Sequence, residues 1–539
     1  MACLRSRTKE AGGLQEGLVT SASAMKLELY EEYRRGPRGL WTAALLGLGV
    51  VALFMHKCRP FYVVGFNVEN LPEAVMAAPA SGHGLQGAQS GKQVMRSLLQ
   101  SAAFSGLNTL RFWAHTTNPS RPLQVAPGRY DEHVFASLDV ALAEAERAGL
   151  RVILSLADNW KYEGGVDEML DWSKTAPKRE AAFPAVKTRS GDVNESVWTP
   201  ERQAYEARRK ALFFVDEGAR QIYKGHVSAI LNRVNTVTGR RYADDPTIMA
   251  FDLLNEPRCL EDHTPGCAAR VGAWVKEMAA YLRSLDANHL VTSGADGFWG
   301  PTDPERRLNP GAALGNAWAS RIGQDFAAHH ASLDFATIHT WPDHWQTPNE
   351  TFVAEWVRDH VRSAGERLAK PLLVEEFGKK VPAATRDAAA VAAARDPVFA
   401  TVYREAERLL VADSALGGTL FWRWGFDAWD AAERGDYGVT PGDSTFEHVR
   451  AHARRVKMLT AARAGAGAAI CPNEDRATAA AWVGASLLGV RRCVLRPTTV
   501  NPPGPRRSLG ALEAASPSFA TRAECCLPGL GAFANGCLS

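Results

Sequence analysis

Short apolar runs alternate with amphipathic stretches from about residue 61 to residue 460. Eight runs have the length and composition of strands that are covered on both faces, and the stretches between them have helical spacing. This alternation predicts a parallel sheet with helices packed outside it. The expected strands are residues 61–67, 107–113, 151–157, 248–256, 289–297, 335–341, 371–378 and 417–424.

The helical spacing is clearest in residues 132–149, which place Val134, Leu138 and Leu142 on one face and end on a glycine, and in residues 270–286. Eight strand–helix units in about 400 residues predict an α/β fold, a (β/α)8 TIM barrel with long loops. The longest insertion, residues 158–213, follows the third strand. That position would place it at the catalytic mouth.

The two ends of the chain differ in composition from the barrel region. Residues 1–56 are expected to form a leader, in which the apolar run 40–55 follows the basic sequence RRGPR. A spanning helix needs about 20 apolar residues, so a signal-peptide core, a short signal anchor and a segment of the fold all stay open for this run. Residues 57–460 are expected to form the catalytic domain, and residues 461–539 a disordered, low-complexity tail.

Charge and cysteine usage narrow the possible partners. With 62 Lys and Arg against 59 Asp and Glu, the net charge of +3 is too small to indicate nucleic acid as a partner. The nine cysteines show no metal-ligand spacing, so no metal site is expected. Cys259 and Cys267 bracket the loop CLEDHTPGC, where a disulfide in an oxidising compartment and two buried thiols are both possible. The sequons at Asn194 and Asn349 agree with a secretory route.

Polar and aromatic residues follow six of the expected strands, at the edge where the active site of such a barrel lies. A single acid at a strand end can cap a helix or pair with a base, but a whole set at one edge points to chemistry. The set comprises Arg111, Trp113, Asn159, Asn255, Glu256, His339, Trp341, Glu376, Trp422 and Trp424.

Glu256 and Glu376 are expected to face each other across the barrel, because three strand–helix units separate them. Two such carboxylates can flank one glycosidic bond, with retention at a separation of about 5 Å and inversion at about 6.5 Å or more. Retention needs Glu256 protonated near neutral pH and Glu376 ionised. We expect His339, Arg111 and a tryptophan N–H at a strand end to keep Glu376 charged.

Two further acids lie close to this pair in the sequence. Adjacent strand residues point to opposite faces, so only one of Glu375 and Glu376 is expected to enter the site, and the EFG context favours Glu376. Glu375 is then expected to make a salt bridge or hydrogen bond under the surrounding helices. Asp252 is expected to be a buried, hydrogen-bonded acid lower in the barrel, without a catalytic role.

Longer stretches resemble the plant-type endo-β-1,4-mannanases of glycoside hydrolase family 5. They include DDPTIMAFDLLNEPRC, DFATIHTWPDHW, LLVEEFG, GLNTLRFWA, RVILSLADNW and GGTLFW, and together they cover nearly all of residues 61–425 in family order. The resemblance implies retaining cleavage of internal β-1,4 links in mannan, glucomannan or galactomannan, without a cofactor. From the basic flank and the apolar run 40–55 we expect a protein that is secreted or anchored through this N-terminal segment, and we expect a monomer.

The resemblance also implies a role for each matching residue. Glu256 would be the acid/base and Glu376 the nucleophile, while Asn255 would bind the sugar 2-hydroxyl. Of the remaining residues, Arg111 and His339 would orient the nucleophile, Trp113 and Trp422 would be platforms for mannose rings, and Arg258 would reach sugars on the leaving-group side.

The sequence departs from the family pattern at two places. Trp341 stands where the family usually has the tyrosine of His-x-Tyr, and an indole can donate a hydrogen bond but cannot accept one. The segment before residue 61 is also shorter than the N-terminal hairpin of the family. The alternatives are therefore another β-1,4-glycanase, a mannan transglycosylase of the same family, or a catalytically impaired, membrane-tethered carbohydrate-binding protein.

Overall fold

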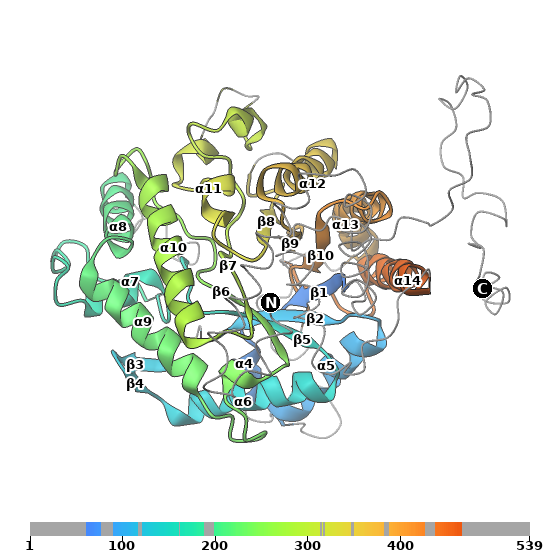
Figure 1. Ribbon diagram of the computed structural model, residues 1–539, viewed down its shortest axis with the longest axis horizontal. Coiled ribbons are helices and arrows are strands. Elements are labelled where there is room, and N and C mark those ends of the chain that lie inside the picture. The colour runs from blue at the N-terminus through green and yellow to red at the C-terminus, as the bar shows by residue number, and fades with distance from the viewer. Residues whose placement is uncertain are drawn as a thin grey trace, which may run out of the picture.

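The eight apolar runs form eight parallel strands of one sheet, at the centre of the molecule in Figure 1. The computed structural model describes residues 61–76, 90–116, 121–160, 162–187, 199–312, 315, 318–345, 350–381, 387–425 and 437–465. The strands are β1 Val63–Asn67, β2 Thr109–Trp113, β5 Arg151–Ser155, β6 Ile248–Asp252, β7 Leu290–Thr292, β8 Ala336–Thr340, β9 Leu372–Phe377 and β10 Leu416–Phe421. All eight predicted strands are confirmed.

The order of the strands in the sheet is β7-β6-β5-β2-β1-β10-β9-β8. Hydrogen bonds also join the two ends of this order: Asp334 N donates to Val291 O at 3.0 Å, and His339 N donates to Asp296 O at 3.0 Å. The sheet therefore closes between β7 and β8, as the predicted TIM barrel requires.

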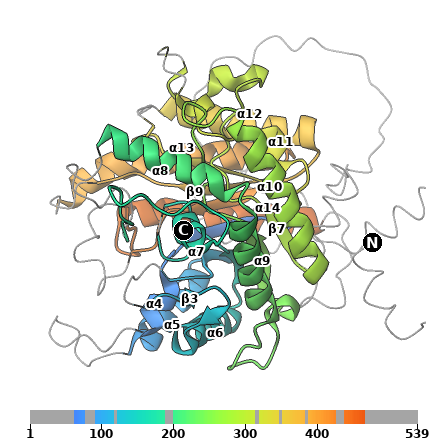
Figure 2. The ribbon, with the colours of Figure 1, turned by 90° about the vertical axis from the view of Figure 1, so that its left-hand side faces the viewer.

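Helices surround the strands on the outside of the barrel (Figure 1). The turned view shows α9 and α10 on one side of the molecule, where they contact each other (Figure 2). The helices are α4 Leu71–Met76, α5 Gly91–Phe104, α6 Glu132–Arg147, α7 Val166–Trp172, α8 Pro200–Phe213, α9 Glu217–Asn232, α10 Cys267–Leu285, α11 Phe326–His330, α12 Glu350–Ser363, α13 Ala388–Val411 and α14 Ser444–Gly465, with short turns of helix η3 Tyr242–Asp244, η4 Pro304–Leu308, η6 Trp318–Arg321 and η7 Ala364–Leu368. A small hairpin, β3 Gln124–Ala126 and β4 Arg129–Tyr130, precedes α6.

The interior of the barrel holds a small apolar layer, separate from the large core between strands and helices. Its members are Val63, Ile153, Met249, Ala250, Leu290, Phe335, Leu373 and Leu420. Because the strands are covered on both faces, they read as continuous apolar runs. Residues two positions further along a strand point to the same face. Polar groups therefore lie directly above this apolar layer, and they include the buried residues Ser155, Asp252 and Glu375.

Two expected strands, β6 and β7, end at least four residues before the predicted residue. β6 ends at Asp252 and β7 at Thr292, although residues up to 256 and 297 were expected to be extended. The chain still follows its neighbours there, because Leu253 N donates to Thr292 O and Asn255 N to Ala157 O. These irregular ends turn Asn255 and Glu256 into the barrel mouth.

A buried carboxylate fixes the entry into β6. Asp139 of α6 is fully buried and accepts hydrogen bonds from Arg233, Thr236 and, at 2.8 Å, the hydroxyl of Tyr242. Tyr242 begins η3, which leads directly into β6. The strand that carries Glu256 is therefore anchored through an ion pair between α6 and the segment that precedes it.

Several expectations concern residues outside the described ones. These are the leader with its apolar run 40–55, the tail beyond Gly465, and the sequons at Asn194 and Asn349. Within the described ranges, no helix is long and apolar enough to span a membrane. The last helix, α14, ends at Gly465, five residues beyond the domain end expected at 460.

Asp139→Ala should lower the free energy of unfolding by about 3–5 kcal/mol, because it leaves Arg233 and the Tyr242 hydroxyl without their buried acceptor. Glu132→Ala is the matched control: Glu132 also pairs with Arg233, but its side chain is 69% exposed, so a loss of only about 0–1 kcal/mol is expected. Urea unfolding of both variants measures the difference. Equal losses would contradict this account of the anchor.

Candidate active site

Arg111 lies at the centre of the predicted site. Its side chain is fully buried on β2 and reaches residues from three other strands or strand ends. Nη1 donates to Glu376 Oε1 at 2.5 Å, Nε to Asp252 Oδ2 at 2.5 Å, and Nη2 to Asn255 Oδ1 at 2.9 Å. One planar guanidinium therefore fixes the positions of an acid from β9 and an acid and an amide from the β6 segment.

Glu256 is held by three donors. Trp160 Nε1 and Arg258 Nη2 donate to Oε2 at 2.5 and 3.0 Å, and His339 Nδ1 donates to Oε1 at 2.8 Å. The backbone of Glu256 has φ 49°, a left-handed conformation that is uncommon for a residue with a side chain. Its N–H donates to Gly294 O at 2.8 Å, which holds this conformation in place.

His339 brings the two predicted carboxylates together. Its Nδ1 lies 2.8 Å from Glu256 Oε1 and 3.4 Å from Glu376 Oε2. These two oxygens can therefore be no more than 6.2 Å apart, the sum of the two distances. The prediction that Glu256 and Glu376 meet across the barrel is confirmed.

The charges of the pair are distributed differently from the prediction. Burial raises the pKa of Glu376 to about 7, although His339 and Arg111 act to lower it. Burial acts on Glu256 in the same direction, but Arg258 and the hydrogen bonds from His339 and Trp160 outweigh it and hold the pKa of Glu256 well below its usual range. The pKa values of the ligand-free site therefore favour an ionised Glu256 and a protonated Glu376, the reverse of the expected arrangement, because three donors hold Glu256, whereas Arg111 is the described hydrogen-bond donor to Glu376.

His339 is the positive partner of both acids. Burial acts to lower its pKa, but the charge of Glu376 and the hydrogen bond to Glu256 raise it well above its usual value. His339 is therefore charged at neutral pH and donates from Nδ1. Trp356 Nε1 donates to the backbone oxygen of His339 at 2.9 Å, which fixes the strand end that carries it.

Glu375 is also inside the barrel, which corrects the prediction that it lies under the helices. Its Oε2 lies 3.6 Å from Arg111 Nε and 3.5 Å from His339 Nε2, and the side chain is fully buried. It follows the interior residue Leu373 by two positions, so strand alternation itself directs it inward. Glu376 reaches the site as well because it lies near the end of β9, beside a register shift between Ile338 and His339 of β8.

Arg258 is held on the outer side of Glu256 by Asp296, which follows β7. Arg258 Nε donates to Asp296 Oδ2 at 3.1 Å, and Gln324 Nε2 donates to the same oxygen at 2.6 Å. Glu256, Asp296 and His339 offer ligand atoms within 4.8 Å of one another, a spacing that would also suit a cation. The guanidinium of Arg258 already binds the two carboxylates, so these residues do not fit a metal.

A disulfide joins Cys259, directly after Arg258, to Cys267 at the start of α10, with the Cα atoms 5.9 Å apart. Of the two possibilities left open by the sequence, the disulfide is the one present. Cys259 N also donates to Ile322 O at 3.1 Å. The chain that leaves the site is therefore tied to α10 and to the segment before α11.

The tryptophans of the site do not share one role. Trp113 is 1% exposed and donates from Nε1 to Asp158 Oδ2 at 3.1 Å. The centre of its ring lies 4.5 Å from the Cζ atom of Arg111. Trp422 is partly exposed and packs against Trp113 and Trp341 with ring centres 5.9 and 6.1 Å apart. Trp422 is therefore better placed to meet a sugar than Trp113, and both platform roles stay predictions.

Among the described residues, no tryptophan N–H donates to Glu376. Trp341 packs instead against Tyr437 and His344, with ring centres 5.1 and 5.7 Å away. The tryptophan that donates to a predicted catalytic carboxylate is Trp160, and its acceptor is Glu256. The expected tryptophan donor to the nucleophile is therefore absent from the described site.

Sequence reasoning missed four residues that position the site: Trp160, Asp158, Asp296 and Gln324. Asp158 accepts from Asn255 Nδ2 at 3.2 Å, and so orients the amide expected to bind the sugar 2-hydroxyl. Trp160 and Asp158 flank Asn159, which the sequence predicts to lie in the site. Their position directly after β5 therefore indicates that they belong to the site as well. Gln324 lies between short elements with no strand-end pattern, and nothing in its sequence context pointed to the site.

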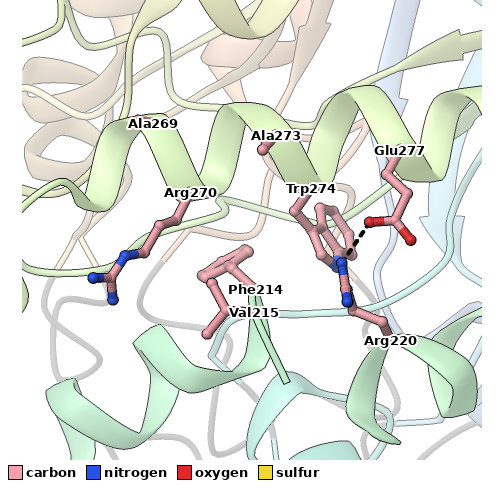
Figure 3. A pocket seen from close by; sticks show the side chains of 8 residues that line it. All are labelled: Phe214, Val215, Arg220, Ala269, Arg270, Ala273, Trp274 and Glu277. Carbon is pink, nitrogen blue, oxygen red and sulfur yellow. Dashed lines mark hydrogen bonds and ion pairs between the residues drawn. The ribbon is translucent and has the colours of Figure 1, made fainter. Parts of the chain in front are cut away.

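The predicted insertion after the third strand reaches the site through α8. Lys210 Nζ donates to Asn159 O at 2.6 Å and lies 5.5 Å from the ring of Trp160. A separate hollow of about 300 Å³ lies on the outer wall between the end of α8, α9 and α10. Figure 3 shows its apolar floor of Phe214 and Trp274 beside the Arg220–Glu277 ion pair. It contains no paired carboxylates and belongs to the outside of the barrel.

The chain matches the family described as "GH family 5 beta-mannosidase-like" over residues 51–448. It is 32% identical to mannan endo-1,4-beta-mannosidase 7 of Arabidopsis thaliana over 412 residues, which cover 74% of this chain and 83% of that protein. It is also 32% identical to mannan endo-1,4-beta-mannosidase 1 of Oryza sativa subsp. japonica, with 77% and 86% of the two chains covered.

Solved structures agree with these relatives. The hyperthermostable endo-1,4-beta-D-mannanase from Thermotoga petrophila is 26% identical, with a TM-score of 0.53 over 73% of this chain and 99% of that one. A family 5 mannosidase from Rhizomucor miehei, at 20% identity and a TM-score of 0.55, shares the fold and covers 75% and 95% of the two chains. The chain belongs to glycoside hydrolase family 5 and, within it, to the β-mannosidase-like enzymes.

Proposed function

We propose that this protein is a retaining endo-β-1,4-mannanase that uses Glu256 and Glu376 as its catalytic pair. The observation that supports this most directly is the contact of both carboxylates with one imidazole. Their facing oxygens are at most 6.2 Å apart, a bound that accommodates the carboxyl separation of about 5–5.5 Å typical of retaining enzymes.

In the first step, Glu376 attacks the anomeric carbon and forms a covalent glycosyl ester, while the leaving oxygen takes a proton from Glu256. In the second step, Glu256 takes a proton from water, whose oxygen displaces Glu376 at the same carbon. Arg111 holds Glu376 Oε1, so Oε2 is the oxygen available for attack. Two inversions give net retention.

The pair must hold one proton for this reaction, and the site is built to hold one. Glu376 binds it with a pKa of about 7, while Glu256 stays ionised far below that pH. Catalysis uses the other arrangement, with the proton on Glu256. The approach of a leaving oxygen to Glu256 and of an electrophilic carbon to Glu376 favours moving the proton to Glu256.

The substrate class follows from the relatives, whose names describe mannan endo-1,4-beta-mannosidases. Mannan, glucomannan or galactomannan is the proposed substrate, with Trp422 and Arg258 as the partly exposed side chains beside the pair. Release of manno-oligosaccharides from mannan, without comparable release from cellulose or xylan, supports this proposal. Both carboxylates and their donors are in place, which favours an enzyme over an impaired carbohydrate-binding protein.

We also propose that the protein acts as a monomer in an oxidising compartment, secreted or anchored by its N-terminal segment. The Cys259–Cys267 disulfide supports such a compartment, because cytosolic thiols are kept reduced. Fractionation of cells that express the full chain, with deglycosylation of the product, tests this proposal. A reduced protein in the cytosol would contradict it.

Azide rescue should separate the roles of the two carboxylates. In Glu256→Ala, glycosylation by Glu376 continues for substrates with a good leaving group, and azide attacks the covalent ester to give a β-mannosyl azide. In Glu376→Ala, azide can attack only the substrate itself, and the product is the α-azide. NMR of the products tells them apart, and the reversed pattern would exchange the two roles.

The pH dependence of kcat/KM should fall on the alkaline side with an apparent pKa of about 7. Above that pH the pair loses the proton that Glu376 holds in the free enzyme, and no acid remains for the leaving oxygen. The acid limb of the profile should have an apparent pKa below the usual range of glutamate. Only at such low pH does Glu256 bind a proton in addition to the one on Glu376. Initial rates measured at substrate concentrations well below KM, from about pH 3 to about pH 9, test this prediction. A kcat/KM that rises beyond pH 7 would contradict it.

A further inference from the structure

Asp252 and Glu375 form a second carboxyl pair directly below the catalytic one. Both side chains are fully buried, Asp252 on β6 and Glu375 on β9. They meet at the same N–H of Arg111, with Nε 2.5 Å from Asp252 Oδ2 and 3.6 Å from Glu375 Oε2. The two carboxyl oxygens that face this N–H can be no more than 6.1 Å apart, the sum of the two distances.

The hydrogen bonds of this pair are incomplete if both acids are ionised. Among the described groups, no donor reaches Asp252 Oδ1 or either oxygen of Glu375 within hydrogen-bond geometry. A buried carboxylate without donors is costly, and two in contact also repel each other. A proton on one acid supplies the missing donor and removes the repulsion in a single change.

The balance of charge leads to the same conclusion. Five buried carboxyl groups contact Arg111, Arg258 or His339, the cations of the site; they are Asp252, Glu256, Asp296, Glu375 and Glu376. Three positive charges cannot neutralise five negative ones. One proton is held by the catalytic pair, and a second is needed below it.

We propose that Asp252 and Glu375 share one proton, carried by Asp252 and donated to Glu375, and that this pair positions Arg111 for the nucleophile. With Asp252 neutral, Glu375 is a charged partner of Arg111, Glu376 becomes the second one when it gives up its proton for the reaction, and Nη1 stays on Glu376 Oε1. An ionised Asp252 would compete for the same guanidinium from its other edge. Asp252 is therefore a positioning residue that acts on the nucleophile through Arg111.

The surrounding groups favour the proton on Asp252. Burial and the charge of Glu375 raise the pKa of Asp252 to about 8, against the influence of Arg111. Burial acts on Glu375 as well, but Arg111 and His339 outweigh it and lower its pKa. The other titratable groups that face the pair are Tyr223 from α9 and His330 from α11, and burial keeps both of them neutral.

The part of this inference that concerns the nucleophile rests on the proposed function, so the test has one arm that needs no activity. Burial raises the pKa of Asp252 above its unfolded value of about 3.9. The stability of the wild type should therefore fall as pH rises from about 5 to about 8, because the unfolded chain gives up this proton. Asp252→Asn has no proton to lose.

Urea unfolding at about pH 5.5 and about pH 8 should show Asp252→Asn gaining stability over the wild type at the higher pH. A difference between the two proteins that does not change with pH would overturn the shared proton. If Asp252→Asn does not fold, the infrared spectrum of Glu376→Gln decides instead. At about pH 7 it should show the carbonyl band of a neutral carboxylic acid, and absence of that band would equally overturn the proposal.

The second arm measures hydrolysis of mannan. The amide introduced by Asp252→Asn would keep a donor toward Glu375, so this variant should retain kcat within about tenfold, whereas Asp252→Ala, which removes the donor, should lose about 10²-fold or more with little change in KM. Equal losses in the two folded variants would contradict the positioning role. A wild type that hydrolyses no mannan would instead refute the proposed function and leave the stability arm intact.

Discussion

The active site depends on one buried guanidinium. Arg111 is fixed on β2 and contacts Asp252 and Asn255 of the β6 segment and Glu375 and Glu376 of β9. These strands are far apart in the sequence but converge at one end of the barrel. The guanidinium is planar and its N–H groups point in fixed directions, so each acceptor must lie along one of them. The proposed nucleophile is therefore oriented before substrate binds.

A second cation, Arg258, performs the corresponding task for the acid/base, and His339 lies between the two groups. Each of the three cations contacts at least two acids. The protonation state of any one acid therefore depends on the others.

The sequence was sufficient to predict the barrel, because each strand is covered on both faces and each polar residue at its end stands out against an apolar run. It also predicted that Glu256, Glu376, Arg111 and His339 lie together at one site. The prediction for Glu375 is wrong because the interior residue Leu373 lies two positions before it, so strand alternation directs Glu375 into the barrel. The charge of Glu256 could not be predicted from the sequence. It depends on the hydrogen bond from Trp160 and on the Asp296–Arg258 contact, and these residues lie in loops whose conformation cannot be read from a local sequence pattern.

The central claim is that Glu376 forms a covalent bond to the sugar while Glu256 transfers the proton. The anomeric configuration of the first product tests it most directly. NMR of a manno-oligosaccharide digest, recorded before mutarotation, should show the β-anomer of the new reducing end appearing first. Initial release of the α-anomer would mean a single displacement by water and would contradict the account.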